Sequence, residues 1–159
     1  MQNFKIEIKW GVLFALSGLV WMILEKSLGW HDVHIDKHAT YTLLFAPIAI
    51  AIYVFALIDK KRNFYKGKMT YVQGFVSGLI ITLVVVILSP LSQYITSAYI
   101  SPEFFSNMIQ YAVETGVLSQ EAAEANFNLS SYMVQAMVGA AVMGLITSAI
   151  VALFVRSKA

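Results

Sequence analysis

The sequence predicts an all-α membrane protein with four transmembrane helices and a short external helical segment between the third and the fourth. Of its 159 residues, 58% are hydrophobic and only 13% are charged, whereas an average soluble domain carries about 25% charged residues. The apolar residues also form four uncharged blocks, and a helix needs about 20 such residues to cross a bilayer. We therefore expect a single membrane domain over residues 1–159, with the lipid bilayer as its solvent.

Each block sets the limits of one expected helix. The first block runs uncharged from Trp10 to Leu24, and a tryptophan stands near each end of this helix, as is typical of membrane interfaces. The second block ends at the charges that begin with Asp59, and the third is uncharged from Met69 to Pro102. The expected helices are 9–30, 40–58, 69–100 and 129–155.

The third block is longer than a perpendicular span requires. We expect its helix to run from about Thr70 past Pro90 and to bend at that proline, which lacks a backbone donor. About 20 residues from Thr70 already cross the hydrocarbon, so residues 91–100 should lie at or beyond the outer interface. Tyr94 and Tyr99 then belong to the outer aromatic belt or lie above it.

Segment 101–128 is expected to form two short helices outside the hydrocarbon. A Ser-Pro-Glu start at Ser101 and a stop at Gly116 bound the first helix, and Ser119 can cap the second. Their apolar faces are expected on the top of the bundle or in the lipid interface. Inward packing against the long helices is the alternative.

Lysine and arginine set the orientation, because cytoplasmic loops of membrane proteins are enriched in them. On one side of the expected topology lie nine of the eleven basic residues: Lys5, Lys9, Lys60, Lys61, Arg62, Lys66, Lys68, Arg156 and Lys158. Only Lys26 and Lys37 lie on the other side. We therefore predict that both termini and the basic loop after the second helix are cytoplasmic. That loop also suits anionic lipid, and we expect no nucleic-acid partner.

Small residues at regular spacing predict close helix packing, since membrane helices associate without help from the hydrophobic effect. The expected packing positions are Gly74 and Gly78 in the third helix, and Ala136, Ala140, Gly144, Ser148 and Ala152 in the fourth. We interpret them as contacts within the chain. A homodimer through the same faces is the alternative.

All three histidines, His31, His34 and His38, lie in the loop after the first helix. In a helical loop they would share one face, and a neighbouring aspartate could complete a zinc or copper shell. The spacing matches no established ligand signature, however, and a short loop has little backbone to fix a site. We therefore expect no high-affinity metal site and no cofactor; a pH-responsive loop is the remaining alternative.

Glu25 and Lys26 are the only ionisable residues inside an expected span, and such residues are functional candidates by default. Glu25 lies about 24 Å along the helix from Lys9, which is close enough to the outer surface for its side chain to snorkel. No second buried ionisable side chain is expected beside it. We interpret Glu25 as a structural residue of the interface.

Three motifs resemble one family. They are LGWHD at 28–32, MTYVQGF at 69–75 followed by Gly78, and ISPEFF at 100–105. Together they resemble domain of unknown function 4199, over nearly the whole chain. The resemblance implies a small inner-membrane protein with four spans, mostly found in Bacteroidetes. It supplies no catalytic residue that could be transferred to this chain.

The expected function is that of a non-enzymatic accessory or interaction subunit, which meets an unidentified membrane protein or a second copy. The chain has no cysteine and no cluster of reactive side chains that would indicate an enzyme. The alternative is a small oligomeric transporter or channel. Its polar lining would consist of Gln73, Ser77, Thr82, Gln93 and Gln135. These side chains should converge on one water-filled cavity in a transporter and lie paired in a dry core in a subunit.

Overall fold

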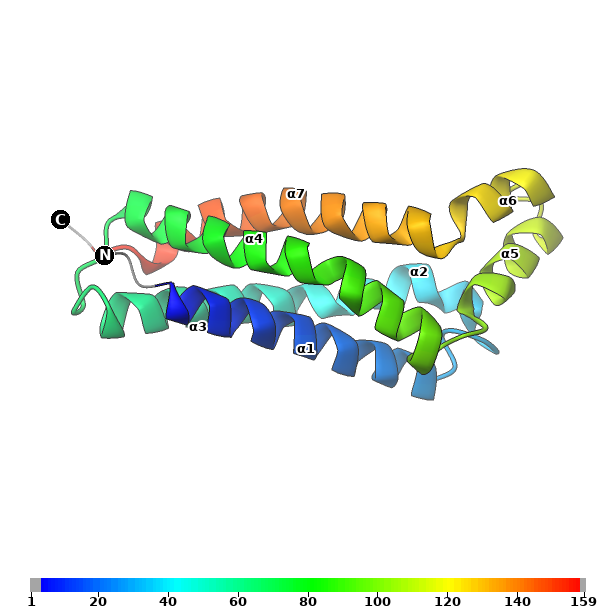
Figure 1. Cartoon of the computed structure of the whole chain (residues 1–159), viewed down its shortest axis with the longest axis horizontal. Coiled ribbons are helices and arrows are strands. Elements are labelled where there is room, and N and C mark those ends of the chain that lie inside the picture. Colours follow the sequence, from blue (N-terminus) through cyan, green and yellow to red (C-terminus); the bar gives the residue numbers. More distant parts are fainter. Residues whose placement is uncertain (1–3, 158–159) are drawn as a thin grey trace.

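Four long helices pack along one another as a bundle (Figure 1). The computed structural model describes residues 4–157. The long helices in this range are α1 (Lys5–Ser27), α3 (Ala46–Asn63), α4 (Tyr71–Ile95) and α7 (Leu129–Val155). Helix α1 begins and α7 ends at the same end of the bundle, which we call the terminal end. Lys158, which the orientation argument counts, lies outside the described residues.

The opposite end of the bundle, the cap end, carries two short helices, α5 (Phe104–Glu114) and α6 (Gln120–Asn126) (Figure 1). We call residues 101–128 the cap. Ser119 caps α6, because its hydroxyl accepts a hydrogen bond from the Ala122 amide at 3.3 Å. The cap therefore consists of two helices that connect the end of α4 to the start of α7.

Shorter elements lengthen two of the spans. The elements η1 (Ile35–Lys37), α2 (His38–Tyr41) and η2 (Thr42–Phe45) lead directly into α3, and a π-helical turn, η3 (Thr96–Ile100), continues α4. The segments long and apolar enough to cross a membrane are Lys5–Ser27, Ile35–Asn63, Tyr71–Ile100 and Leu129–Val155. Residues 4–157 contain no strand. The predicted all-α class with four membrane-crossing helices is confirmed.

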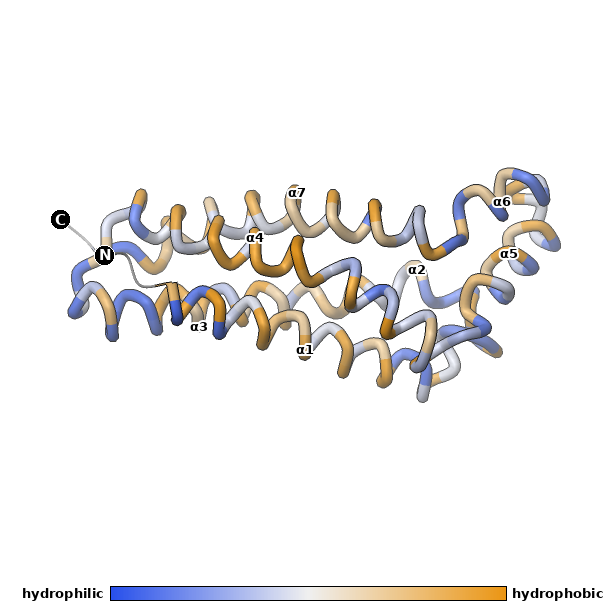
Figure 2. Tube along the Cα trace, in the orientation of Figure 1, coloured by the Kyte–Doolittle hydropathy of each residue, from blue (hydrophilic) through white to orange (hydrophobic). Residues whose placement is uncertain are grey.

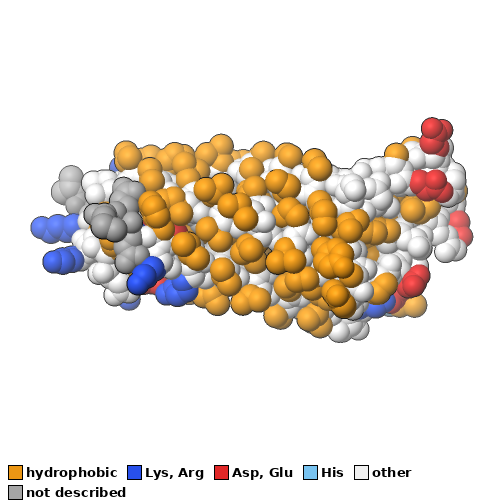
Figure 3. Space-filling view, in the orientation of Figure 1, with side chains coloured by type: hydrophobic (Ala, Val, Ile, Leu, Met, Phe, Trp, Pro, Cys, Tyr) orange, Lys and Arg blue, Asp and Glu red, His pale blue; other side chains and the backbone are white. Residues whose placement is uncertain are grey.

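The surface matches this architecture. Hydrophobic residues dominate the middle of the bundle, and hydrophilic residues gather at its two ends (Figure 2). Large apolar side chains of the long helices face outward, such as Val20 of α1 at 66% exposure and Phe154 of α7 at 83%. In the view of Figure 3, lysine and arginine gather at the terminal end and acidic side chains at the cap end. These features are those of a multi-pass membrane protein.

Helices α4 and α7 make the most extensive contact in the bundle, and small residues allow it. A Cβ placed on Gly78 would lie 2.6 Å from the Cβ of Ser148, and one on Gly144 would overlap the Thr82 side chain. Both glycines are buried. Close approach of the two backbones replaces the hydrophobic effect as the source of packing energy in lipid.

The same contact continues toward the terminal end. A Cβ on Gly74 would lie 3.3 Å from the Cβ of Ala152, which is fully buried. Toward the cap end, Ala136 and Ala140 are half-buried. Gly74, Gly78, Gly144, Ser148 and Ala152 therefore lie along a contact within the chain.

The ion pairs at the terminal end correct one expectation. Helix α1 begins at Lys5 and includes Glu7, which is 1% exposed and lies 2.8 Å from the Lys60 ammonium of α3. The expectation that Glu25 and Lys26 are the only ionisable residues inside a span is therefore wrong. Glu7 remains helical and buried because Lys60 neutralises it, and a charge buried in low dielectric requires such a partner.

The α4–α7 contact gives a prediction. Replacing Gly144 by Leu places a large side chain against Thr82, and overpacking of this kind costs about 1–3 kcal/mol of unfolding free energy. Leu145→Ala, on the adjacent exposed face, should cost far less. Thermal unfolding in detergent, followed by circular dichroism, measures both. Equal loss of stability in the two variants would show that this face of α7 is not a tight interface.

Candidate functional site

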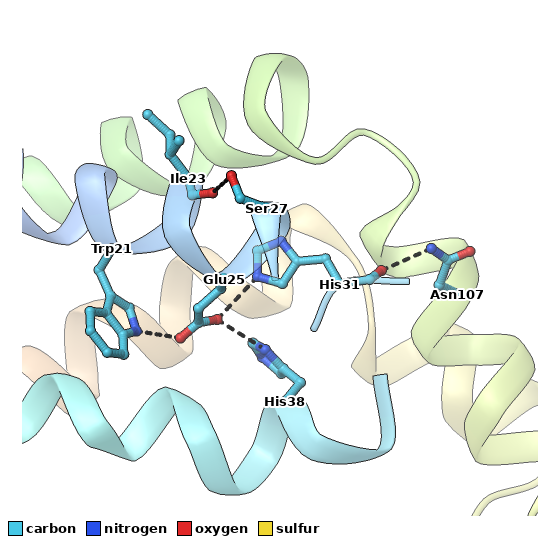
Figure 4. A network of polar contacts seen from close by, with 7 residues as sticks. All are labelled: Trp21, Ile23, Glu25, Ser27, His31, His38 and Asn107. Carbon is cyan, nitrogen blue, oxygen red and sulfur yellow. Dashed lines mark hydrogen bonds and ion pairs between the residues drawn. The ribbon is translucent and has the colours of Figure 1, made fainter. Parts of the chain in front are cut away.

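Three of the four ionisable candidates meet at the cap end. Glu25 lies near the end of α1, His31 in the loop after α1, and His38 at the start of α2 (Figure 4). The Glu25 Oε2 atom is 3.1 Å from Nε2 of His31 and 3.1 Å from Nδ1 of His38. Glu25 is 0% exposed and His31 1%. We call these three side chains the Glu–His–His cluster; His34 is exposed and not part of it.

A tight reversal of the chain brings His31 over Glu25. Gly29 adopts φ +76 directly after α1, a conformation that glycine reaches without a steric penalty. The His34 amide donates to the Gly29 carbonyl at 2.8 Å, and the Trp30 amide donates to the Glu25 carbonyl at 3.0 Å. The loop thus folds back onto the last turn of the helix that precedes it.

Asp32 fixes this reversal. Its carboxylate accepts hydrogen bonds from the Lys26 ammonium at 2.7 Å and from the Val33 amide at 2.6 Å. These two bonds hold the pKa of the Asp32 carboxyl below its ordinary value, so Asp32 is ionised at neutral pH and the bonds persist there.

The helical loop that the three-histidine hypothesis requires is not present, and one expectation about Glu25 is wrong. The loop is not one helix, because the chain reverses at Gly29 and becomes helical again only at η1 and α2. His34 therefore diverges from the other two histidines. Glu25 has ionisable neighbours that the spacing of the sequence did not indicate: His31, which is buried, and His38, which is partly buried.

The other carboxylate oxygen of Glu25, Oε1, also has a hydrogen-bond partner. Oε1 accepts a hydrogen bond from the indole Nε1 of Trp21, one helical turn earlier (Figure 4). A buried carboxylate needs donors around it, since its desolvation is otherwise unfavourable by several kcal/mol, on the order of 10 or more in the driest sites. The carboxylate is thus fixed in one orientation.

Helix α5 packs on the cluster. The Phe104 ring lies 5.0 Å from the imidazole of His31 and 4.9 Å from that of His38, measured between ring centroids. The side-chain amide of Asn107 donates to the His31 carbonyl at 2.9 Å (Figure 4). The first two turns of α5 are therefore attached directly to the Glu–His–His cluster.

A cavity of about 170 Å³ adjoins the cluster. Both imidazoles line it, together with Gln93, Ser101 and Tyr132 among others. Three buried polar atoms in this region form no hydrogen bond within residues 4–157: Ser101 Oγ, Nδ1 of His31 and Nδ1 of His38. The His38 atom is close enough to Glu25 for an ion pair, but its direction does not suit a hydrogen bond.

Sequence comparison places the chain in a family. The family described as "Protein of unknown function (DUF4199)" matches residues 9–157. The chain belongs to this family. The matched DUF4199 region includes the whole cluster and the cap. Comparisons with curated proteins and with solved structures give no match.

Sequence reasoning missed three side chains that complete this DUF4199 site: Trp21, Phe104 and Asn107. The four-residue offset from Trp21 to Glu25 was a usable signal, because such residues are neighbours on a helix. Phe104 lies in one of the family motifs, but no sequence spacing indicates contact with a loop so distant along the chain. Their shared role is to surround the cluster.

The buried carboxylate gives the next prediction. Glu25→Ala leaves the Trp21 indole and the His31 imidazole without their acceptor in a buried site, and breaking a buried ion pair in this way costs about 3–5 kcal/mol. Glu121→Ala, at an exposed position of the cap, should change stability by no more than about 0.5 kcal/mol. Chemical unfolding in detergent measures both. A Glu25→Ala protein as stable as the control would show that the cluster does not hold the fold.

Proposed function

We propose that this DUF4199 protein is a non-enzymatic accessory subunit of the bacterial inner membrane, and that its cap binds a membrane-protein partner. The observation that carries the proposal is the attachment of α5 to the Glu–His–His cluster through Phe104 and Asn107. A connector between two helices needs no such anchor. A binding surface does benefit from one, because a surface that is already ordered loses less entropy when a partner binds.

The exposed part of the cap has a distinct chemistry. Glu114, Glu121 and Glu124 are exposed, and Val117 between the two cap helices is 70% exposed. An apolar residue among acidic ones suits a partner that offers a small apolar patch bordered by lysine or arginine. The partner surface we propose is therefore basic at its rim.

The distribution of charge supports an external cap. Basic residues gather at the terminal end and acidic residues at the cap end (Figure 3). Since basic loops are retained in the cytoplasm, the terminal end is proposed to be cytoplasmic and the cap to face the periplasm.

The positions of the polar side chains favour a subunit over a transporter. Gln73 accepts a hydrogen bond from the Thr70 amide at the terminal end, Gln93 lines the cavity at the cap end, and Gln135 is exposed. Thr82, in the middle, is paired with the Tyr53 hydroxyl at 2.8 Å. Side chains dispersed in this way do not line a common path.

The cavity gives little support to an enzyme. Hydrolysis by a serine, a histidine and a carboxylate would require a hydrogen bond between nucleophile and base. Ser101 and His31 both line this cavity, and within residues 4–157 neither Ser101 Oγ nor His31 Nδ1 forms a hydrogen bond. A non-enzymatic role is therefore the proposal.

Cysteine labelling tests the orientation in this cysteine-free chain. An impermeant thiol reagent added to spheroplasts should label Gln120→Cys in the cap and leave Asn63→Cys in the basic loop unlabelled until the membrane is opened. The reverse pattern would place the cap in the cytoplasm.

Photo-crosslinking in living cells tests the partner. A photoreactive residue at Val117 should give one discrete protein adduct, while the same residue at Leu153, on the lipid-facing surface of α7, should give none. Mass spectrometry identifies the adduct. Equal adducts from both positions, or none from Val117, would contradict the proposal, and an adduct with a second copy would replace the accessory role by a homodimer.

A further inference from the structure

We propose that Glu25, His31 and His38 bind one divalent transition-metal ion, of the class of Zn²⁺, at the cap end of the bundle. Two imidazole nitrogens and one carboxylate oxygen form a donor set that suits Zn²⁺ and its neighbours in the first transition row. The inference concerns the purified chain alone, so it does not depend on the proposed partner.

The geometry is close to that of a metal site. One ligand atom from each of the three residues lies within 4.8 Å of the others, and two of the separations, from Glu25 Oε2 to His31 Nε2 and to His38 Nδ1, are 3.1 Å. In a tetrahedral site with metal–ligand distances of about 2.0–2.1 Å, ligand atoms lie about 3.4 Å apart. Small rotations of side chains already in contact would therefore suffice.

Unpaired polar atoms are the second observation that points to a ligand. Nδ1 of His38 is buried, lies beside the Glu25 carboxylate and forms no hydrogen bond with any other residue of the described range 4–157. Ser101, which is 1% exposed, has an unpaired hydroxyl at the adjoining cavity. Buried polar atoms without partners are rare in folded proteins and call for an explanation. A metal ion would take the lone pair of His38 directly.

A neighbouring side chain orients the Glu25 carboxylate for metal binding. Because Trp21 donates to Oε1 of Glu25, the other oxygen, Oε2, is turned toward the two imidazoles. Such outer contacts orient the ligands of metal sites, and their removal typically weakens metal binding by about 10–100-fold. Trp21 is therefore proposed as a positioning residue.

The cavity supplies the fourth coordination position. Three protein ligands leave one position of a tetrahedral shell for water or a small ligand. Both imidazoles face the cavity of about 170 Å³, which has room for several water molecules at about 30 Å³ each. The Ser101 hydroxyl at its wall provides a hydrogen-bond partner for a molecule bound there.

This proposal replaces the expectation of no metal site. That expectation assumed three histidines on one short loop with nothing to fix them. In the structure the three proposed ligands come from α1, from the loop and from α2. Phe104 of α5 packs against both imidazoles. Two of these side chains stand on helices, and packing against α5 holds the third, so the site has the rigidity that the loop alone would lack.

The test uses the full-length protein in detergent, stripped of metal with a chelator. Isothermal titration with Zn²⁺ should show one ion per chain with micromolar or tighter affinity, and Co²⁺ should give the visible absorption of a four-coordinate site. His38→Gln, at a position where the side chain is only partly buried, should weaken binding at least about 100-fold, and Trp21→Phe about 10–100-fold.

His34→Gln is the matched control, since His34 belongs to the same loop but is exposed and outside the cluster. It should leave binding unchanged. Absence of Zn²⁺ and Co²⁺ binding in the wild-type protein overturns the proposal, as does binding that depends on His34 and not on His38. Glu25→Gln adds a third ligand variant; because Glu25 is fully buried and this variant could fail to fold, the wild-type titration and His38→Gln decide the outcome.

Discussion

The need of a buried carboxylate near the end of α1 for polar partners determines how the cap end is built. Glu25 is fully buried, and an ionised carboxylate in low dielectric requires partners on every side. Trp21 supplies one from its own helix, while the two histidines come from beyond the reversal at Gly29. Helix α5 then closes over the imidazoles through Phe104. The loop, the start of the second span and the cap are thus assembled around a single charge.

The terminal end of the bundle also contains a buried ion pair, whereas the middle is held by close helix packing. At the terminal end, Glu7 and Lys60 form an ion pair between α1 and α3. Between the two ends, α4 and α7 are held by the close approach of Gly78 and Gly144 to the facing helix. Electrostatic contacts therefore fix α1 at both of its ends, and van der Waals contact fixes α7 along its length.

The fold was predictable from the sequence and the site was not, for a physical reason. Length and hydropathy define a membrane span locally, so four blocks of apolar residues suffice to predict four helices. The Glu–His–His cluster depends on a reversal at Gly29 and on contact with Phe104, more than 70 positions along the chain from His31. Helical periodicity carries no information about either. It grouped His34 with the other two histidines and left Glu25 without partners, although Trp21 was within reach of the same reasoning.

The contact between Phe104 and the two imidazoles has a thermodynamic consequence. One face of this contact belongs to the buried cluster and the other to the helix that begins the cap. A ligand that moves the imidazoles changes the free energy of each arrangement of α5, and a molecule bound to the cap changes the free energy of each arrangement of the imidazoles. The coupling must be equal in both directions, since linked equilibria are reciprocal. Binding at the proposed metal site would therefore be thermodynamically coupled to binding at the cap through the Phe104 ring.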